Sequence, residues 1–261
     1  MMTMTHKFMK FLLLSCVVLG FLASCATKKE VVYFQDALDY ETIVSNNTAN
    51  NKFKINDIVD ITISTLDAEA SLPFNIFRGF QEGGRGNIGE QMDYIVDKNG
   101  EIDFPVIGNI KIADLTPQET KELLKEELKT YLKNPIINIR LKNFRVTILG
   151  QVNRPGTYEV NGEQITVLEA IGLANDLNIK GMRENVLIIR DYNGAKVYHR
   201  IDLTSKDVLS SPNYYLTQND VVYVEPNKSA ITSSALDNRA TIAISIASVL
   251  ITSTVILISR R

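Results

Sequence analysis

The sequence predicts an α+β fold, since segments with the pattern of β-strands outnumber segments with the pattern of helices. Apolar and polar residues alternate in short runs such as 53–64 and 195–203, as expected for strands with one buried face. Helix-opening sequences occur at Thr116 and Thr166, each followed three residues later by a glutamate. The chain also ends in an uncharged apolar run, which predicts one further helix after the folded part.

The N-terminus has the layout of a secretory signal peptide. Two lysines precede an apolar run at residues 11–22, and small residues follow it. The segment Leu22-Ala23-Ser24-Cys25 resembles the bacterial lipobox, in which the signal peptide is cut before a cysteine that is then acylated. We therefore predict removal of residues 1–24 and lipid attachment at Cys25. The alternative is an uncleaved N-terminal membrane helix, for which the apolar run is short.

Composition argues against several classes of function. Removing residues 1–24 takes two lysines and no acidic residue from the 28 basic and 30 acidic residues, which leaves a formal charge of −4 and nothing that suggests nucleic acid. Cys16 leaves with the signal peptide and lipid consumes Cys25, so one mature chain can form no disulfide. His199 lies in an alternating segment and is expected to be an ordinary strand residue. No catalytic residue, cofactor site or metal site is predicted.

The first part of the chain predicts strands separated by a long loop. Strands are expected at residues 53–64 and, as a hairpin around the turn Asp97-Lys98-Asn99-Gly100, at residues 94–104. The glycine-rich segment between them contains residues 84–89, which match a dinucleotide-binding pattern in form. That pattern needs a preceding strand and a following helix to hold a phosphate, whereas a strand is expected here after the glycines. We therefore interpret the segment as a loop.

Two helices are expected within the folded part, each opened by a capping box. The capping residues are Thr116 with Glu119 and Thr166 with Glu169. Leu124, Leu128 and Tyr131 are expected on the buried face of the first helix. Further strands are expected at residues 136–141, 145–152, 157–160, 186–190, 195–203 and 221–224.

The last stretch of the chain predicts a membrane-spanning helix. Residues 240–259 contain no charge, proline or glycine. About 20 helical residues at about 1.5 Å each cover about 30 Å, which is the hydrocarbon thickness of a bilayer. We therefore predict one C-terminal transmembrane α-helix at residues 240–261.

Hydroxyl side chains gather on one face of this predicted helix, within an arc of about 60° at about 100° per residue. They are candidate pore-lining residues: Thr241, Ser245, Ser248, Thr252 and Ser259. Val255 interrupts the stripe. The other interpretation is a simple lipid-embedded anchor, in which each hydroxyl bonds to a backbone carbonyl one turn earlier.

The middle of the chain resembles a known family in two consecutive segments. The first resembles the polysaccharide export domain of the Wza-type outer-membrane lipoproteins through Val96-Asp97-Lys98-Asn99-Gly100-Glu101-Ile102, Phe104-Pro105-Val106-Ile107-Gly108, Leu115-Thr116-Pro117 and Asn134-Pro135. The second resembles a soluble-ligand-binding β-grasp (SLBB) domain through Val146-Thr147-Ile148-Leu149-Gly150-Gln151-Val152, Pro155-Gly156-Thr157-Tyr158, Thr166-Val167-Leu168-Glu169-Ala170-Ile171 and Asn219-Asp220-Val221-Val222-Tyr223-Val224. The chain departs from the larger members in having room for one β-grasp domain.

The resemblance implies a translocon subunit for capsular polysaccharide or exopolysaccharide in the bacterial outer membrane, and not an enzyme. Identical subunits are expected to form a ring, a homo-oligomer with periplasmic main domains, a porin-like α-helical pore and an extracellular C-terminus. An inner-membrane polysaccharide copolymerase, the polysaccharide and membrane lipid are the expected partners. The alternative is an outer-membrane-anchored periplasmic binding or scaffold lipoprotein without a pore. Lipid at Cys25 already supplies an anchor, which favours the translocon.

The expected organisation is a signal peptide at residues 1–24, a lipidated N-terminus and linker at 25–52, an export domain at 53–143, an SLBB β-grasp domain at 144–226, a linker at 227–239 and the transmembrane helix at 240–261. Ordered structure is expected to begin after Asn51, because the polar run that ends there offers no core-forming side chain.

Overall fold

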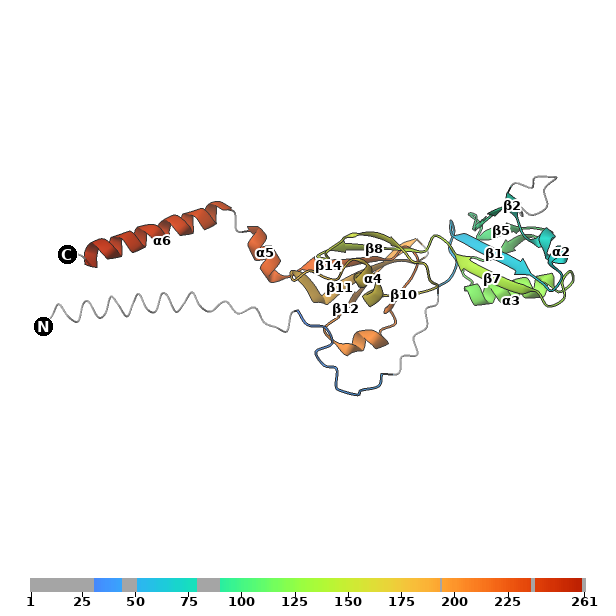
Figure 1. The fold of residues 1–261 in the computed structure, drawn as a ribbon, viewed down its shortest axis with the longest axis horizontal. Coiled ribbons are helices and arrows are strands. Elements are labelled where there is room, and N and C mark those ends of the chain that lie inside the picture. Colours follow the sequence, from blue (N-terminus) through green and yellow to red (C-terminus); the bar gives the residue numbers. More distant parts are fainter. Residues whose placement is uncertain (1–30, 44–50, 79–89, 193, 236–237, 260–261) are drawn as a thin grey trace.

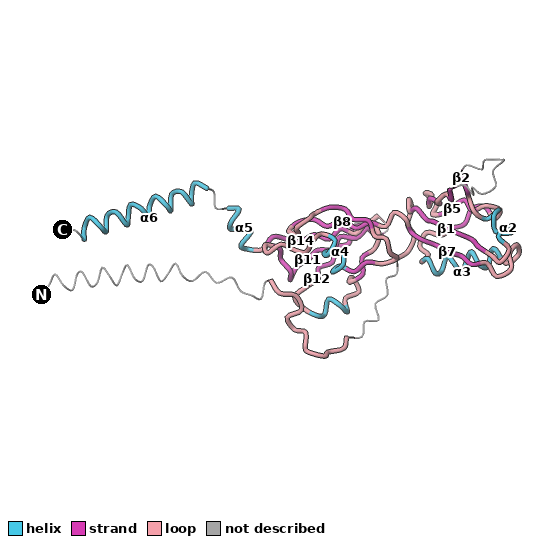
Figure 2. Tube along the Cα trace, in the orientation of Figure 1, coloured by secondary structure: helices cyan, strands magenta, loops and turns pink. Residues whose placement is uncertain are grey.

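Two β-rich domains follow each other along the chain (Figure 1). The computed structural model describes residues 31–43, 51–78, 90–192, 194–235 and 238–259. The core of the first domain lies between Phe53 and Ile139, and the core of the second lies between Phe144 and Val224. Figure 2 shows strands in both domains with short helices around them, so the predicted α+β class of the folded part is confirmed.

The first domain packs a three-stranded sheet against helices and a hairpin. Its elements are β1 (Ile58–Ser64), α2 (Ala68–Ser71), η2 (Leu72–Phe74), β2 (Phe77–Arg78), β3 (Glu90–Gln91), β4 (Tyr94–Ile95), β5 (Glu101–Phe104), β6 (Gly108–Lys111), α3 (Pro117–Leu128) and β7 (Ile136–Leu141). Strand β1 lies between β4 and β7 and runs antiparallel to both. Strands β2 and β3 form one separate antiparallel pair, and β5 and β6 form another.

Helix α3 begins where the sequence predicts. The Thr116 hydroxyl accepts from the backbone N–H of Glu119 at 3.2 Å, and the Glu119 carboxylate accepts from the backbone N–H of Thr116 at 2.8 Å. The two leucines predicted on its inner face are fully buried. Tyr131 is 55% exposed because the helix ends before it, and Leu132 is buried in its place.

The second domain is a five-stranded sheet covered on one face by helix α4. Its elements are β8 (Arg145–Gly150), β9 (Gly156–Glu159), β10 (Ile165–Thr166), α4 (Val167–Leu173), β11 (Gly181–Tyr192), β12 (Ala195–Ile201), η3 (Lys206–Ser210), β13 (Tyr215–Leu216) and β14 (Val221–Pro226). The strand order is β12-β11-β14-β8-β9, and only the β14–β8 pair among these is parallel. The predicted capping box of Thr166 and Glu169 opens α4.

The hairpin predicted over residues 94–104 does not form as one ladder. The turn itself is present, since the Asp97 carboxylate accepts from the backbone N–H groups of Asn99 and Glu101, each at 2.8 Å. Strand β4 pairs with β1, whereas β5 pairs with β6 over four residue pairs. The turn between β5 and β6 has Val106 and Gly108 at positive φ. The longer ladder after this tight turn therefore takes the pairing edge of β5.

Residues 31–43, here called the strap, lie against the second domain. Two backbone N–H groups of the strap donate to the carbonyls of Leu203 and Thr204, at 3.3 and 2.7 Å. Asp36 accepts from the backbone N–H of Lys206 at 2.7 Å. Ordered structure therefore begins before the predicted start at Asn51. The sequence of the strap has no strand or helix period because backbone groups and isolated side chains make its contacts.

Tyr33 is the main side-chain anchor of the strap. Its hydroxyl donates to the carboxylate of Asp176, and the guanidinium of Arg183 lies 5.3 Å from the centre of its ring. Burial and the neighbouring Asp176 raise the pKa of Tyr33 well above its ordinary value, so the hydroxyl remains a donor at neutral pH. Arg183 is 4% exposed and donates to the carbonyl of Gly181 at 3.2 Å.

We expect Tyr33→Ala to release the strap, because it removes both the hydroxyl donor and the ring beneath Arg183. The strap would then be cleaved after Glu41 by a glutamyl endopeptidase at least about tenfold faster, since local opening governs cleavage of a docked segment. The control is Tyr40→Ala, because Tyr40 belongs to the same segment and is fully exposed. Equal cleavage rates for the two variants, followed by mass spectrometry, would show that Tyr33 does not hold the strap.

Two helices follow the second domain: α5 (Lys228–Ala235) and α6 (Asn238–Ser259). Figure 1 shows them extending from the second domain on the side opposite to the first domain. The side chains of residues 242–256 are all exposed, and the large apolar ones among them are 45% to 65% exposed. This is an unusually apolar surface for a helix without a covering layer.

The prediction of a transmembrane helix at residues 240–261 is wrong. Among the described residues, no helix has both the length and the apolar character needed to cross a membrane. The part of α6 with described side chains, residues 242–256, covers about 22 Å at about 1.5 Å per residue, against about 30 Å of hydrocarbon. The predicted helical pore and extracellular C-terminus depended on that helix and lose their basis with it.

Candidate functional site

The two domains meet at the short connection between β7 and β8. Leu141, the last residue of β7, packs against the hydrophobic cores of both domains. Phe144, three residues later, is already buried in the second core. A connection this short, with a shared apolar contact, leaves the domains little freedom to move relative to each other.

Side-chain amides bind this connection to both domains. Asn143 accepts from the backbone N–H of Ile58 at 3.0 Å and donates to the carbonyl of Asn56 at 3.2 Å. Gln218 is 3% exposed; it accepts from the backbone N–H of Arg145 at 2.7 Å and donates to the carbonyl of Asn143. Amides that use donor and acceptor together are satisfied in only one arrangement of the junction.

Charged groups complete the junction. The Lys54 ammonium donates to the carbonyl of Gln218 at 3.3 Å, and so reaches from the first domain to the second. The Asp57 carboxylate, 2% exposed, accepts from the backbone N–H of Lys54 at 2.8 Å. Burial raises the pKa of Asp57 above its usual value, while the N–H and the charge of Lys54 act in the opposite direction.

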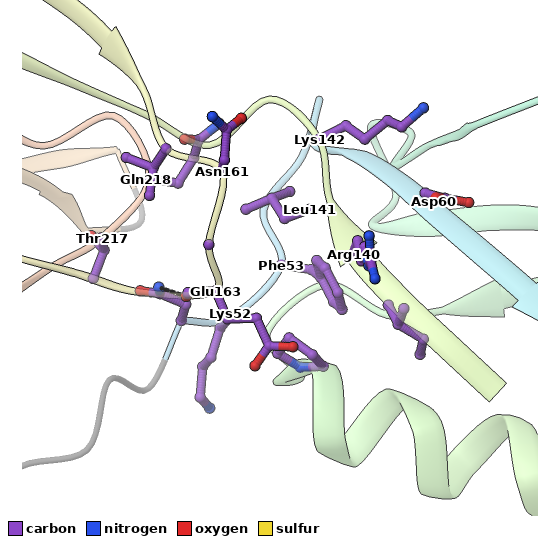
Figure 3. A pocket seen from close by; sticks show the side chains of 15 residues that line it. Lys52, Phe53, Asp60, Arg140, Leu141, Lys142, Asn161, Glu163, Thr217 and Gln218 are labelled. Carbon is purple, nitrogen blue, oxygen red and sulfur yellow. Dashed lines mark hydrogen bonds between the residues drawn. The ribbon is translucent and has the colours of Figure 1, made fainter. Parts of the chain in front are cut away.

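A cavity of about 400 Å³ lies between the two domains at this junction. Figure 3 shows Asp60, Arg140 and Lys142 of the first domain on one side and Asn161, Thr217 and Gln218 of the second on the other. Leu141 lies between the two groups. The cavity exists only because the domains are joined, since neither domain supplies both walls.

The chemistry of the cavity lining is mixed. Lys52 and Arg140 supply positive charge, and Asp60 and Glu163 supply negative charge. Leu141 contributes a half-buried apolar surface beside them. A cavity of this volume with convergent polar groups and an apolar wall can hold a small polar ligand that has one apolar face.

The lipid-attachment and metal questions stand as follows. Cys25 lies outside the described residues, and so do the side chains of Thr241 and Ser259. His199 is a half-buried residue of β12, as predicted for an ordinary strand position. Within the ranges that the structure describes, no three His, Cys, Asp or Glu side chains come close enough to hold a metal ion.

The other three predicted pore-lining residues bond to their own helix. Ser248 Oγ donates to the carbonyl of Ser245, and Thr252 Oγ1 donates to the carbonyl of Ser248, each at 2.8 Å. This is the back-bonding expected of the simple anchor interpretation. A pore-lining role for these hydroxyls stays a prediction, and it has lost the membrane-spanning helix on which it rested.

The sequence did not point to the cavity residues. They lie in separate stretches that come together only when the domains pack, and no spacing along the chain records that contact. Arg140 and Lys142 alternate with apolar residues at the end of β7, which is the pattern of an ordinary solvated strand face. Asn51 and Lys52 fell in the predicted linker. Only the break in strand pattern at 142–144 signalled a junction.

Two protein-family models match the chain in succession. The model for polysaccharide biosynthesis/export protein matches residues 45–142, and the model for the SLBB domain matches residues 144–224. The boundary falls at Asn143, the residue whose amide joins the two domains. The chain belongs to the polysaccharide biosynthesis/export family. The predicted resemblance to Wza-type export proteins is thereby confirmed, and the two domains are called the export domain and the SLBB domain below.

Two relatives carry the name EPS I polysaccharide export outer membrane protein EpsA. The chain is 24% identical over 139 residues to that of Ralstonia solanacearum, which is 52% of this chain and 36% of the relative. It is 30% identical over 88 residues to that of Ralstonia nicotianae (strain ATCC BAA-1114 / GMI1000), which is 33% of this chain and 23% of the relative. The matched parts are thus well under half of each relative's length.

Proposed function

We propose that this chain is a subunit of an outer-membrane assembly that exports capsular polysaccharide or exopolysaccharide. The observation that carries the proposal is the succession of an export domain and an SLBB domain, matched separately along the chain and joined by a satisfied polar junction. The EpsA relatives, which their names place in polysaccharide export at the outer membrane, support the same role. The chain acts by guiding the polymer and not by chemistry on it.

Membrane attachment is proposed through lipid at Cys25. The strap supports this, because Tyr33 is fixed to the SLBB domain only eight residues after that cysteine. Eight residues reach at most about 26 to 29 Å, so the SLBB domain would lie within that distance of the lipid-bearing leaflet. The export domain lies beyond the SLBB domain, away from α6 (Figure 1). Both domains would then face the periplasm.

The proposed assembly is a ring of identical subunits. The apolar surface of α6, with large side chains 45% to 65% exposed, supports contact with copies of the same helix, because such a surface is costly to leave in water. An inner-membrane copolymerase is proposed to deliver the polymer. A second candidate, a binding or scaffold lipoprotein without a pore, is favoured by the hydroxyls of α6 that bond to their own backbone.

Deletion of the gene followed by complementation tests the function. We expect the deletion to remove polymer from washed whole cells, and the full chain to restore it. Cys25→Ala should restore little surface polymer, whereas Cys16→Ala should restore it fully, because Cys16 belongs to the removed signal peptide. Unchanged surface polymer in the deletion strain would overturn the proposal. Detergent-solubilised chain seen as single particles without a ring, in a strain that needs the chain for export, would favour the scaffold.

A further inference from the structure

The cavity between the export and SLBB domains carries nearly balanced charge. Lys142 is already engaged by Asp93, with 3.0 Å between the ammonium and the carboxylate. Lys52 and Arg140 then face two carboxylates, those of Asp60 and Glu163. In the described part of the chain, neither Lys52 nor Arg140 forms an ion pair. A strongly anionic or strongly cationic ligand would meet like charge here, so the lining favours a neutral one.

The hydrogen-bonding groups of the lining are of both kinds. Arg140 and Lys52 can only donate, Asp60 and Glu163 can only accept when ionised, and the exposed Asn161 can do both. A ligand that satisfies this set must donate and accept at neighbouring positions. Hydroxyl groups do so, whereas a phosphate or carboxylate only accepts.

Asn51 provides a second, independent observation. Its amide nitrogen donates to the carbonyl of Glu163 at 2.7 Å, which fixes the orientation of the amide. Its oxygen, Oδ1, is buried in the cavity wall and has no hydrogen-bond partner among the described residues. An unsatisfied buried acceptor costs about 1 to 3 kcal/mol until a donor reaches it. A ligand hydroxyl is such a donor, and an anion is not.

The apolar part of the lining fits the same class of ligand. Pro117, Leu141 and Val160 are half-buried and lie beside the polar groups. A pyranose ring presents C–H groups on its faces and hydroxyls around its edge, and planar polar groups such as guanidinium, carboxylate and amide can bind vicinal hydroxyls in pairs. The cavity volume of about 400 Å³ is at the lower end of the range for small-ligand sites.

We propose that this cavity binds one neutral sugar unit of the exported polymer, with Arg140 and Asn161 as the residues that contact it from the two domains. The proposal rests on the proposed export function for the source of the sugar. Because the walls belong to different domains, a bound sugar contacts both. With few contacts the affinity is weak, in about the millimolar range, which lets a polymer enter and leave such a site.

The test is binding of sugar fragments to the full mature chain in detergent. The probes are di- to tetrasaccharides made by partial acid hydrolysis of the exopolysaccharide of the strain that carries this chain, with inorganic phosphate as the comparison, both titrated by saturation-transfer NMR. We expect saturable binding of the fragments. The double variant Arg140→Ala/Asn161→Ala should raise their Kd by at least about tenfold.

The control is the double variant Arg154→Ala/Asn109→Ala, which removes the same residue types at exposed positions outside the cavity and should leave the Kd within about twofold. Thermal unfolding of both double variants checks that they fold. No saturable fragment binding, equal loss in both double variants, or cavity-dependent binding of phosphate in place of sugar would overturn the sugar site. If the deletion strain still exports polymer, the proposed function fails separately, whatever the fragments do.

Discussion

Gly150→Ala is expected to unfold the SLBB domain or bring it close to unfolding. Gly150 ends β8 with φ at +89°, and a Cβ atom built there would lie 2.1 Å from the carbonyl oxygen of Val224. That oxygen already accepts from the backbone N–H of Gln151 at 2.9 Å, so it cannot move away without losing a hydrogen bond. Positive φ alone costs a residue with a side chain about 1 to 3 kcal/mol.

The steric conflict falls on the one parallel pair of the five-stranded sheet, where Gly150 is in register with Val224. We therefore expect a loss of at least about 3 kcal/mol in the free energy of unfolding, a large part of the stability of an ordinary domain. Urea unfolding of the full chain measures it. Gly172→Ala is the matched control, because α4 leaves open space around that position and alanine should stabilise the helix by about 0.5 to 1 kcal/mol.

Similar values for the two alanine variants would mean that the β8–β14 register differs from the one described. The expected opposite signs follow from the backbone alone, since both variants add the same methyl group.

Local sequence rules predicted the parts of this fold that local interactions determine. Both capping boxes open their helices at Thr116 and Thr166, because the bonds lie within four consecutive residues. Strand β7 was predicted with its observed bounds, since its inward residues Ile137 and Ile139 alternate with polar ones. The sequence therefore specified both domain cores.

The features that were missed depend on contacts between distant residues. The strap is bound through single side chains such as Tyr33, whose partner Asp176 is 143 residues away. The cavity needs Asn161 and Arg140 to face each other across a domain junction, and strand alternation gives only the face on which each lies. For α6, apolar composition predicted a membrane span that the described residues do not support. Composition reports what a surface avoids, but not what covers it.

The Asn219-Asp220 segment, part of the resemblance to SLBB domains, has a structural explanation in a buried ion pair. The Asp220 carboxylate is fully buried and lies 2.7 Å from Nη2 of Arg190, with Nε of Arg190 at 3.1 Å. It also accepts from the backbone N–H and the hydroxyl of Thr217, at 2.8 and 3.0 Å. One carboxylate thus holds the turn between β13 and β14 against the centre of β11.

We expect Arg190→Met to cost about 3 to 5 kcal/mol in the free energy of unfolding, because methionine keeps much of the side-chain volume but leaves Asp220 as a buried charge without a cation. The double variant Arg190→Met/Asp220→Asn should be more stable than Arg190→Met alone, since the second change removes the uncompensated charge while an amide can still accept from Thr217. Urea unfolding of the three proteins gives the comparison.

The exposed pair of Lys129 and Glu126, with side chains 60% and 64% exposed, provides the control. Lys129→Met should cost less than about 0.5 kcal/mol, because water already solvates both charges there. If Arg190→Met cost no more than this, or if Asp220→Asn made the double variant worse, the carboxylate would not depend on Arg190 for its charge balance. The hydrogen bonds from Thr217 would then hold the turn alone, and the stability of the SLBB domain would rest on its apolar core without this ion pair.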